Sequence, residues 1–73
     1  MTYRGVKHIA RRHDPDSQEW QVYRLSSAGE VQIALIIKDD QDYRPFTAVR
    51  AAGGLVTEWD TFEAAFEYVA KTF

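Results

Sequence analysis

The C-terminal segment of the chain carries an apolar stripe at helical spacing. Its members recur every three or four residues, and they are Phe62, Ala65, Phe66, Val69, Ala70 and Phe73. Asp60 stands before the stripe and Glu63 follows three residues later, so this pair favours a capped helix over 60–73. A helix with a single apolar face is stable only against another apolar layer. The rest of the chain therefore has to provide a surface for this helix to cover.

Residues 31–38 show the two-residue period of a β-strand. One set of alternating side chains is entirely apolar and is expected to face the core: Val31, Ile33, Leu35 and Ile37. The other set is only half polar, because Ala34 and Ile36 belong to it. We therefore expect this strand to be central in its sheet, or its second face to be covered by another part of the structure or by another subunit.

Two further strands are expected before this one. Residues 20–25 are rich in aromatic and β-branched side chains, and 26–29 have the residue types of a turn, which predicts a hairpin with the strand that follows. Residues 3–11 match either a strand or a helix, and Gly5 together with the hairpin favours a strand. Residues 14–17, around Pro15, then form the connecting loop.

Two structures are compatible with the segment 44–59. Pro45 suits the first turn of a short helix, which Gly53 would end. Alternatively, 46–51 and 55–59 are the strands of a hairpin that turns at Gly53 and Gly54. We favour the hairpin, because threonine, valine and tryptophan favour strands and so short a helix is weak by itself.

These elements together predict a single α+β domain over 1–73. It is an antiparallel β-meander of four or five strands with one C-terminal α-helix packed on one face. A chain of 73 residues, 45% of them hydrophobic, has the composition of a small folded domain. Cores of this size are often completed by a partner subunit, which makes a homodimer one of the expected states.

The expected location of the protein is the cytoplasm. The longest apolar run, 33–37, is far shorter than the ~20 residues that cross a bilayer, and no hydrophobic stretch follows residues 1–4. The chain contains no cysteine, which fits a reducing compartment. We expect no membrane partner.

The sequence contains no pattern that indicates an enzyme, a cofactor or a metal site. Asp39, Asp40 and Asp42 lack the spacing of a calcium loop, so we expect a solvated turn there. His8 and His13 would lie on opposite faces of a strand. The chain has no cysteine nucleophile, and its serines lie in turn sequences. We therefore expect a non-catalytic protein.

The N-terminal part of the chain is basic and the rest is acidic. Residues 1–24 contain five basic and three acidic side chains, whereas 25–73 contain four basic and eight acidic ones. A candidate polyanion-binding site consists of Arg4, Lys7, Arg11 and Arg12, since such residues neutralise phosphates. A net charge of −2 argues against a dedicated nucleic-acid-binding domain, and on a strand Arg12 would point away from Arg11.

Short pieces of the chain resemble a known DNA-binding fold. The pieces are 3–7 (Tyr-Arg-Gly-Val-Lys), 20–24 (Trp-Gln-Val-Tyr-Arg), 62–65 (Phe-Glu-Ala-Ala) and Tyr68. They resemble the three-strand-plus-helix domains of plant ethylene-response factors and phage integrase arm domains, and this resemblance implies reading of the major groove by the sheet. The segment 30–59 is longer than the matching part of those domains, and its aspartate cluster departs from their pattern. No functional residue is carried over.

Large aromatic side chains are more numerous than a thin core needs, and tryptophan and tyrosine often anchor protein interfaces. With the half-polar second face of 31–38, they define the candidate interface residues Trp20, Tyr23, Ala34 and Ile36. We therefore expect a small non-catalytic binding module that associates with a protein partner or with itself. The alternative is a nucleic-acid-binding domain that uses the basic N-terminal residues.

Overall fold

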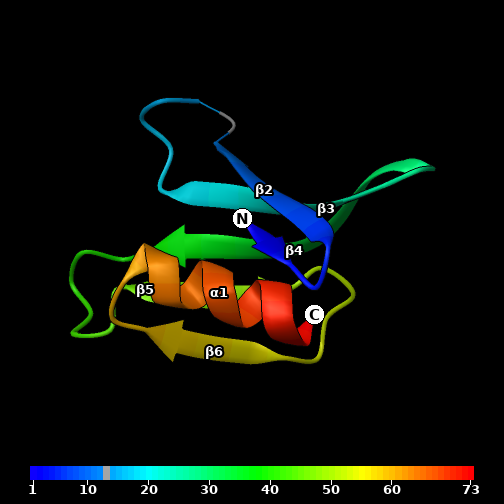
Figure 1. Ribbon diagram of the computed structural model, residues 1–73. Coiled ribbons are helices and arrows are strands. Elements are labelled where there is room, and N and C mark those ends of the chain that lie inside the picture. The colour runs from blue at the N-terminus through cyan, green and yellow to red at the C-terminus, as the bar shows by residue number, and fades with distance from the viewer. Residues whose placement is uncertain (13) are drawn as a thin grey trace.

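The computed structural model describes residues 1–12 and 14–73 and contains six β-strands and one α-helix (Figure 1). The strands are β1 (Thr2–Tyr3), β2 (Val6–Arg12), β3 (Glu19–Ser26), β4 (Gly29–Lys38), β5 (Phe46–Arg50) and β6 (Val56–Trp59), and the helix is α1 (Phe62–Thr72). All six strands form one antiparallel sheet in the order of the chain. The predicted α+β architecture is confirmed, with six strands in place of four or five.

The additional strand arises at the N-terminus. The single strand predicted over 3–11 is divided by a tight turn at Arg4 and Gly5, whose φ angles are 52° and 80°. Two successive residues with positive φ form the type of turn that joins antiparallel strands, and glycine adopts this conformation at little cost. The chain therefore folds back after Tyr3, which pairs with Val6.

The segment 44–59 forms the predicted hairpin, and the alternative of a short helix is wrong. Strands β5 and β6 pair in a regular register from Phe46 opposite Trp59 to Val49 opposite Val56. Gly53 in the connecting turn has a positive φ of 86°, a conformation that suits glycine. Because the chain enters α1 directly after this hairpin, β6 is left at the edge of the sheet.

Helix α1 is capped by Thr61, one residue later than predicted. Thr61 has an extended backbone with φ of −132°, and its Oγ1 accepts a hydrogen bond of 3.1 Å from the amide of Ala64. Asp60 lies outside the helix, with Oδ1 3.8 Å from Nε of Arg44. With 11 residues, α1 is too short to cross a bilayer, and the described part of the chain contains no helix that could.

The core lies between α1 and the face of the sheet that curls around it (Figure 1). Ala65 and Val69 of the helix are fully buried there. The sheet contributes Val22, Ile33, Ala34, Ile36 and Ala48. Aromatic rings close one end of this core, where the centroid of Trp20 lies 5.0 Å from that of Phe62. The helix thus covers one face of the sheet, as expected.

Strand β4 is central, as predicted, but over 34–37 its two faces are the reverse of the prediction. Ala34 and Ile36 are fully buried beneath α1, whereas Val31 and Ile37 keep 44% and 37% of their surface exposed. Small alanine side chains allow the helix to approach the sheet closely, which favours this face for the core.

A β-bulge in β4 explains why both Ile33 and Ala34 are buried although they are consecutive. Val22 pairs with Ala34, but the next residue of β3, Tyr23, pairs with Gln32, so Ile33 is an additional residue in β4. A bulge of this kind interrupts the two-residue alternation of side chains. The period of the sequence therefore assigns the wrong face to part of this strand.

Candidate interaction surfaces

The face of the sheet opposite α1, here called the outer face, carries a set of adjacent aliphatic side chains. Leu35, Val49 and Val56 are neighbours across β4, β5 and β6, and Ile37 lies beside them on β4. Val56 is 61% exposed and Ile37 is 37% exposed, whereas Leu35 and Val49 are half-buried. These four residues form the outer apolar row. A solvated sheet face usually carries polar side chains, so this row is a candidate contact surface.

Charged side chains of opposite sign lie at the two ends of the outer face. Lys7 and Arg11 alternate with the buried His8 along β2, which places them on the outer face. Glu19 pairs with Ile37, Ile37 pairs with Thr47, and Thr47 pairs with Glu58, so both glutamates lie in one row across the outer face. Glu19 therefore lies diagonally beside Arg11, whose register partner is Gln21, whereas Lys7 and Glu58 lie at opposite corners of the outer face.

Of the four predicted interface residues, Tyr23 lies on the outer face. Its hydroxyl donates a hydrogen bond of 3.2 Å to Oε1 of Gln21. Trp20 lies on the other face of the sheet and packs against the core. Ala34 and Ile36 are covered by α1 of the same chain and are not surface residues. The prediction for these two is corrected, because the helix itself covers the face that a subunit was expected to cover.

The four predicted polyanion-binding residues do not gather on one surface. Arg4 lies in the turn between β1 and β2, and Lys7 and Arg11 lie on the outer face. Arg12 lies on the opposite face, because successive side chains of a regular strand point to opposite sides of the sheet. The sequence therefore places these cations close together along the chain but not in space.

Arg11 and Arg12 are both engaged within the chain. Arg11 donates from both terminal nitrogens to the carboxylate of Glu30, with 2.6 Å between Nη1 and Oε2. This hydrogen-bonded pair raises the pKa of Arg11 and lowers the pKa of Glu30. Arg12 donates a hydrogen bond of 3.0 Å to the carbonyl of Ser17, and its guanidinium lies 5.1 Å from the ring centroid of Trp20. Neither side chain is left as a free cation.

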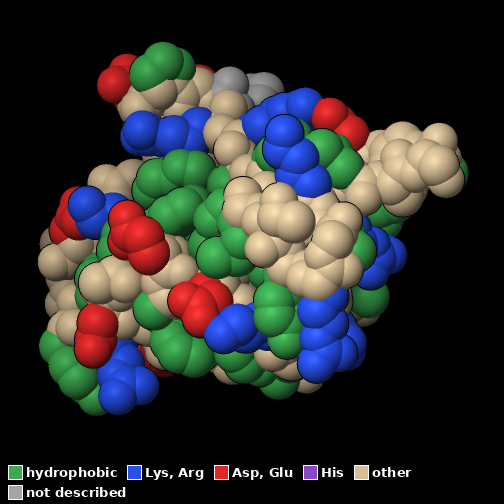
Figure 2. Space-filling view, in the orientation of Figure 1, with side chains coloured by type: hydrophobic (Ala, Val, Ile, Leu, Met, Phe, Trp, Pro, Cys, Tyr) green, Lys and Arg blue, Asp and Glu red, His purple; other side chains and the backbone are tan. Residues whose placement is uncertain are grey.

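A basic depression of about 250 Å³ lies between β1, β2 and the C-terminal end of α1. Arg4, Arg24 and Lys71 line it, and Lys and Arg side chains gather on this side of the molecule (Figure 2). Lys71 is also paired with Glu67, which raises the pKa of Lys71. The sequence analysis does not indicate this cluster, because Arg24 and Lys71 are far apart in the chain and only the fold brings them together.

His8 is a buried polar side chain at the bottom of the basic depression, with 2% of its surface exposed. Its Nδ1–H donates a hydrogen bond of 3.2 Å to the carbonyl of Val6. Desolvation lowers the pKa of His8 below its usual value, although the hydrogen bond to Val6 opposes this effect. The nearby charge of Arg24 lowers the pKa further. Burial therefore favours the neutral form of the imidazole.

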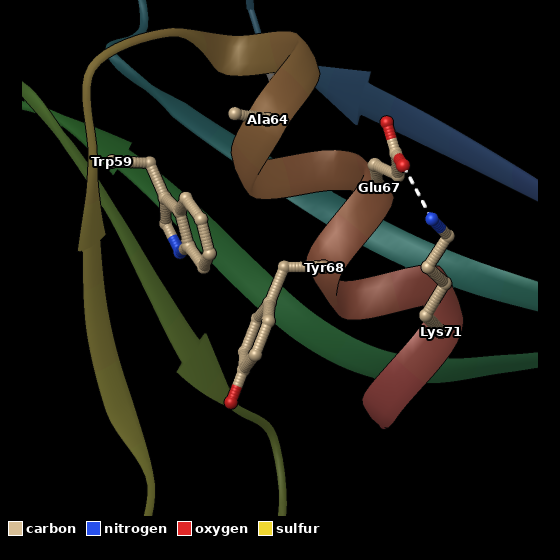
Figure 3. A pocket seen from close by; sticks show the side chains of 5 residues that line it. All are labelled: Trp59, Ala64, Glu67, Tyr68 and Lys71. Carbon is tan, nitrogen blue, oxygen red and sulfur yellow. Dashed lines mark hydrogen bonds and ion pairs between the residues drawn. The ribbon is translucent and has the colours of Figure 1, made fainter.

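A second depression, of about 310 Å³, lies between β6 and α1 and is here called the β6–α1 groove (Figure 3). Trp59 of β6 and Tyr68 of α1 pack together in it, with ring centroids 4.9 Å apart. Ala64, Glu67 and Lys71 line it from the helix, and the ion pair between Glu67 and Lys71 lies at its rim. No pattern in the sequence links Trp59 to Tyr68, because only the fold brings β6 beside α1.

The aspartate cluster after β4 stabilises the loop between β4 and β5. Asp39 and Asp42 each accept a hydrogen bond from the backbone amide two residues later. The hydrogen bond from Lys38 lowers the pKa of Asp40, and a second one from Gln18 has the same effect. Among residues 1–12 and 14–73, no three His, Cys, Asp or Glu side chains are arranged to hold a metal ion.

Two surfaces thus combine exposed apolar side chains with charged neighbours: the outer face of the sheet and the β6–α1 groove. Both contain residue types that are common in protein interfaces. Comparisons with protein-family models, curated proteins and solved structures find no match for this chain.

Proposed function

We propose that this protein is a non-catalytic association module that pairs with a second copy of itself through the outer face of its sheet. The outer apolar row carries the proposal, because its side chains are adjacent across β4, β5 and β6 on the face opposite α1. Burial of such surface favours association by about 25 cal/mol per Å², less the entropy lost on binding. A chain of this length has a thin core that a second copy would extend.

The charges on the outer face favour a second copy as the partner. Lys7 lies at one corner, and Glu58 lies at the far corner. A two-fold axis in the plane of the interface, perpendicular to the line between these corners, brings the basic corner of each copy over the acidic corner of the other. A self-complementary surface of this kind joins apolar contacts with opposite charges.

The alternative function, nucleic-acid binding through Arg4, Lys7, Arg11 and Arg12, has less support. Arg11 and Arg12 point to opposite faces of β2, so one duplex would not contact both. The outer face carries more carboxylates than cations, and the carboxylates would repel the phosphates of a nucleic acid. The basic depression at Arg24 lies on the other side of the sheet.

Sedimentation velocity over a dilution series tests the proposed dimer. We expect the native chain to change from dimer to monomer between about 500 and 1 μM, the range of a weak standard interface. Ile37→Glu places a carboxylate in the outer apolar row and should weaken the dimer at least about tenfold. Tyr43→Glu is the matched control, because Tyr43 is 85% exposed in the loop between β4 and β5. It should associate like the native chain.

A strictly monomeric chain at all concentrations would contradict the proposal, and so would an Ile37→Glu variant that dimerises normally. The same samples can be mixed with a short DNA duplex at low salt. If binding occurs and the double variant Arg4→Glu with Arg11→Glu loses both the affinity and the salt dependence, the nucleic-acid alternative takes the place of the dimer.

A further inference from the structure

Strand β6 is an edge of the sheet whose backbone groups are directed outward. It pairs with β5 alone among the described strands. The amide of Arg50 donates a hydrogen bond of 3.0 Å to the carbonyl of Leu55, which identifies Leu55 as a residue bonded toward β5. Because bonded and unbonded positions alternate along an antiparallel strand, the N–H and C=O groups of Val56 and Glu58 point to the free edge.

This edge has little of the protection that natural sheets usually place on an edge strand. Prolines and lysines commonly block such edges, and Val56–Trp59 contains neither. Val56 is 61% exposed. At the other end of the sheet, β1 has only two residues and contacts α1. The β6 edge is therefore the one more open to an added strand.

The β6–α1 groove lies directly beside this edge and is lined by aromatic side chains (Figure 3). An added strand would lie about 4.8 Å from β6, with alternate side chains directed to the two faces of the sheet. A residue opposite Thr57 or Trp59 would point to the helix side and enter the groove. The volume of about 310 Å³ is at the low end for a ligand pocket and suits one or two side chains.

Acidic side chains surround the groove and the edge. They are Glu58, Asp60, Glu63 and Glu67, against the two cations Arg44 and Lys71, each of which is already ion-paired. Several of the Asp and Glu side chains on the helix side lie over α1 and β6 (Figure 2). Glu58 lies on the outer face, so a basic residue opposite it on an added strand would form a favourable cross-strand pair.

We propose that β6 binds an extended peptide segment of a partner protein, which adds to the sheet as a further strand. An apolar side chain of the peptide sits over Trp59 and Tyr68 in the β6–α1 groove, and a lysine or arginine lies beside Glu58. The backbone hydrogen bonds of Val56 and Glu58 supply affinity, and the groove supplies the preference for a side chain. A second copy of β6 is a poor occupant, because it would bring two acidic edges together. This site shares Val56 with the outer apolar row and Glu58 with the charges of the outer face. Its outward backbone groups and the β6–α1 groove are not used by the proposed dimer.

The test uses the full chain, labelled with ¹⁵N, and a synthetic peptide followed by amide chemical shifts. The probe is an acetylated and amidated seven-residue peptide in which valine, phenylalanine and valine alternate with lysines. We expect saturable shifts at 56–59 and 64–71, including the indole N–H of Trp59. A peptide methylated at the backbone nitrogens that face β6 should bind at least about tenfold more weakly, because it loses strand pairing.

Two pairs of variants separate the edge from the groove. Glu58→Pro removes an outward N–H, which an edge strand tolerates, and should weaken binding at least about tenfold. Its control, Glu58→Gln, keeps the N–H and should lose only about two- to threefold. Ala64→Arg fills the groove from α1 with a good helix former and should also weaken binding about tenfold. Its control, Thr72→Arg, adds the same side chain at an exposed position outside the groove.

The absence of saturable shifts up to millimolar peptide would overturn the proposal. So would binding that Glu58→Pro and Ala64→Arg both leave intact, or shifts that map to Leu35, Ile37 and Val49 in place of 56–59 and 64–71. If Glu58→Pro dissociates a dimer that Glu58→Gln leaves intact, the loss comes from the backbone N–H, so the β6 edge pairs with another β6 and the peptide assignment is wrong. The Ile37→Glu variant should bind the peptide normally, so a failed dimer and a failed peptide site give different results.

Discussion

Thr61 determines where α1 begins, since its side chain accepts the hydrogen bond from the amide of Ala64. Replacing an N-cap threonine by alanine leaves that amide without its partner and costs about 1 kcal/mol. We expect Thr61→Ala to lower the free energy of unfolding in urea by this amount. Thr61→Ser should retain most of the stability, because serine can accept the same hydrogen bond. Asp60→Ala, at the position first predicted as the cap, should have a much smaller effect, and a larger one would contradict the assignment.

His8 makes the stability of the fold sensitive to acid. Burial lowers the pKa of His8 in the folded chain below its usual value of 6.5, so the unfolded chain binds more protons once the pH falls below that value. The stabilisation that comes from the neutral His8 is complete above pH 6.5 and is lost as the pH falls through the lowered pKa of His8 in the folded chain. The charges of Arg24 and of the N-terminal amine both act to lower the pKa of His8.

His8→Gln tests this effect, because glutamine can donate to the carbonyl of Val6 but does not titrate. We expect urea unfolding of the native chain to show a clear loss of stability between pH 7.5 and 5. The His8→Gln variant should lose less stability between pH 7.5 and 5, since only the remaining titratable groups then make its free energy of unfolding depend on pH. Equal losses in the two proteins would show that His8 titrates normally in the folded state.

At the scale of the element, the two faces of β4 lead to a direct comparison of neighbouring residues. Ile36 is fully buried beneath α1, whereas Ile37 is 37% exposed on the outer face. Ile36→Val removes a buried methyl group and should cost about 0.5–1.5 kcal/mol of unfolding free energy. Ile37→Val should cost less than about 0.5 kcal/mol. Urea unfolding of the two variants, at concentrations where the chain is monomeric, shows which face is the core. A larger loss of stability in Ile37→Val than in Ile36→Val would support the face predicted from the sequence.

Several elements could be predicted because their signals are local. The apolar spacing of 62–73 gives α1, and the residue types of 46–59 with two glycines give the β5–β6 hairpin. The turn at Arg4 was missed because arginine at positive φ has no signature in the sequence. The bulge at Ile33 was missed because a bulge depends on pairing with β3 and leaves no mark in the alternation of β4 itself.

At the scale of the whole molecule, the proposed dimer should respond to salt. Its two-fold arrangement places Lys7 of one copy near Glu58 of the other, and salt screens such exposed pairs. We expect the dissociation constant to rise about two- to fivefold between 50 and 300 mM sodium chloride, by sedimentation velocity. Lys7→Gln should reduce this dependence. A dimer that strengthens with salt would indicate an interface without complementary charges.

The candidate sites could be predicted only in part. Tyr23 lies half-buried on the outer face, and its role as an interface residue stays a prediction. The outer apolar row and the β6–α1 groove each join residues from strands or helices that are distant in the chain. Their members look like ordinary core residues in the sequence, since aliphatic and aromatic side chains are the usual content of a core.

The sequence by itself determined the secondary structure of most of the chain, the antiparallel order of the strands and the position of the single helix. These follow from periodicity, turn residues and short connections, all of which act between near neighbours. Only the tertiary structure decided which face of β4 lies under α1, which cations stay accessible, and which aromatic residues meet at the edge of the sheet. Each of these depends on strand register and on the side from which the helix packs, and such contacts join residues far apart in the chain.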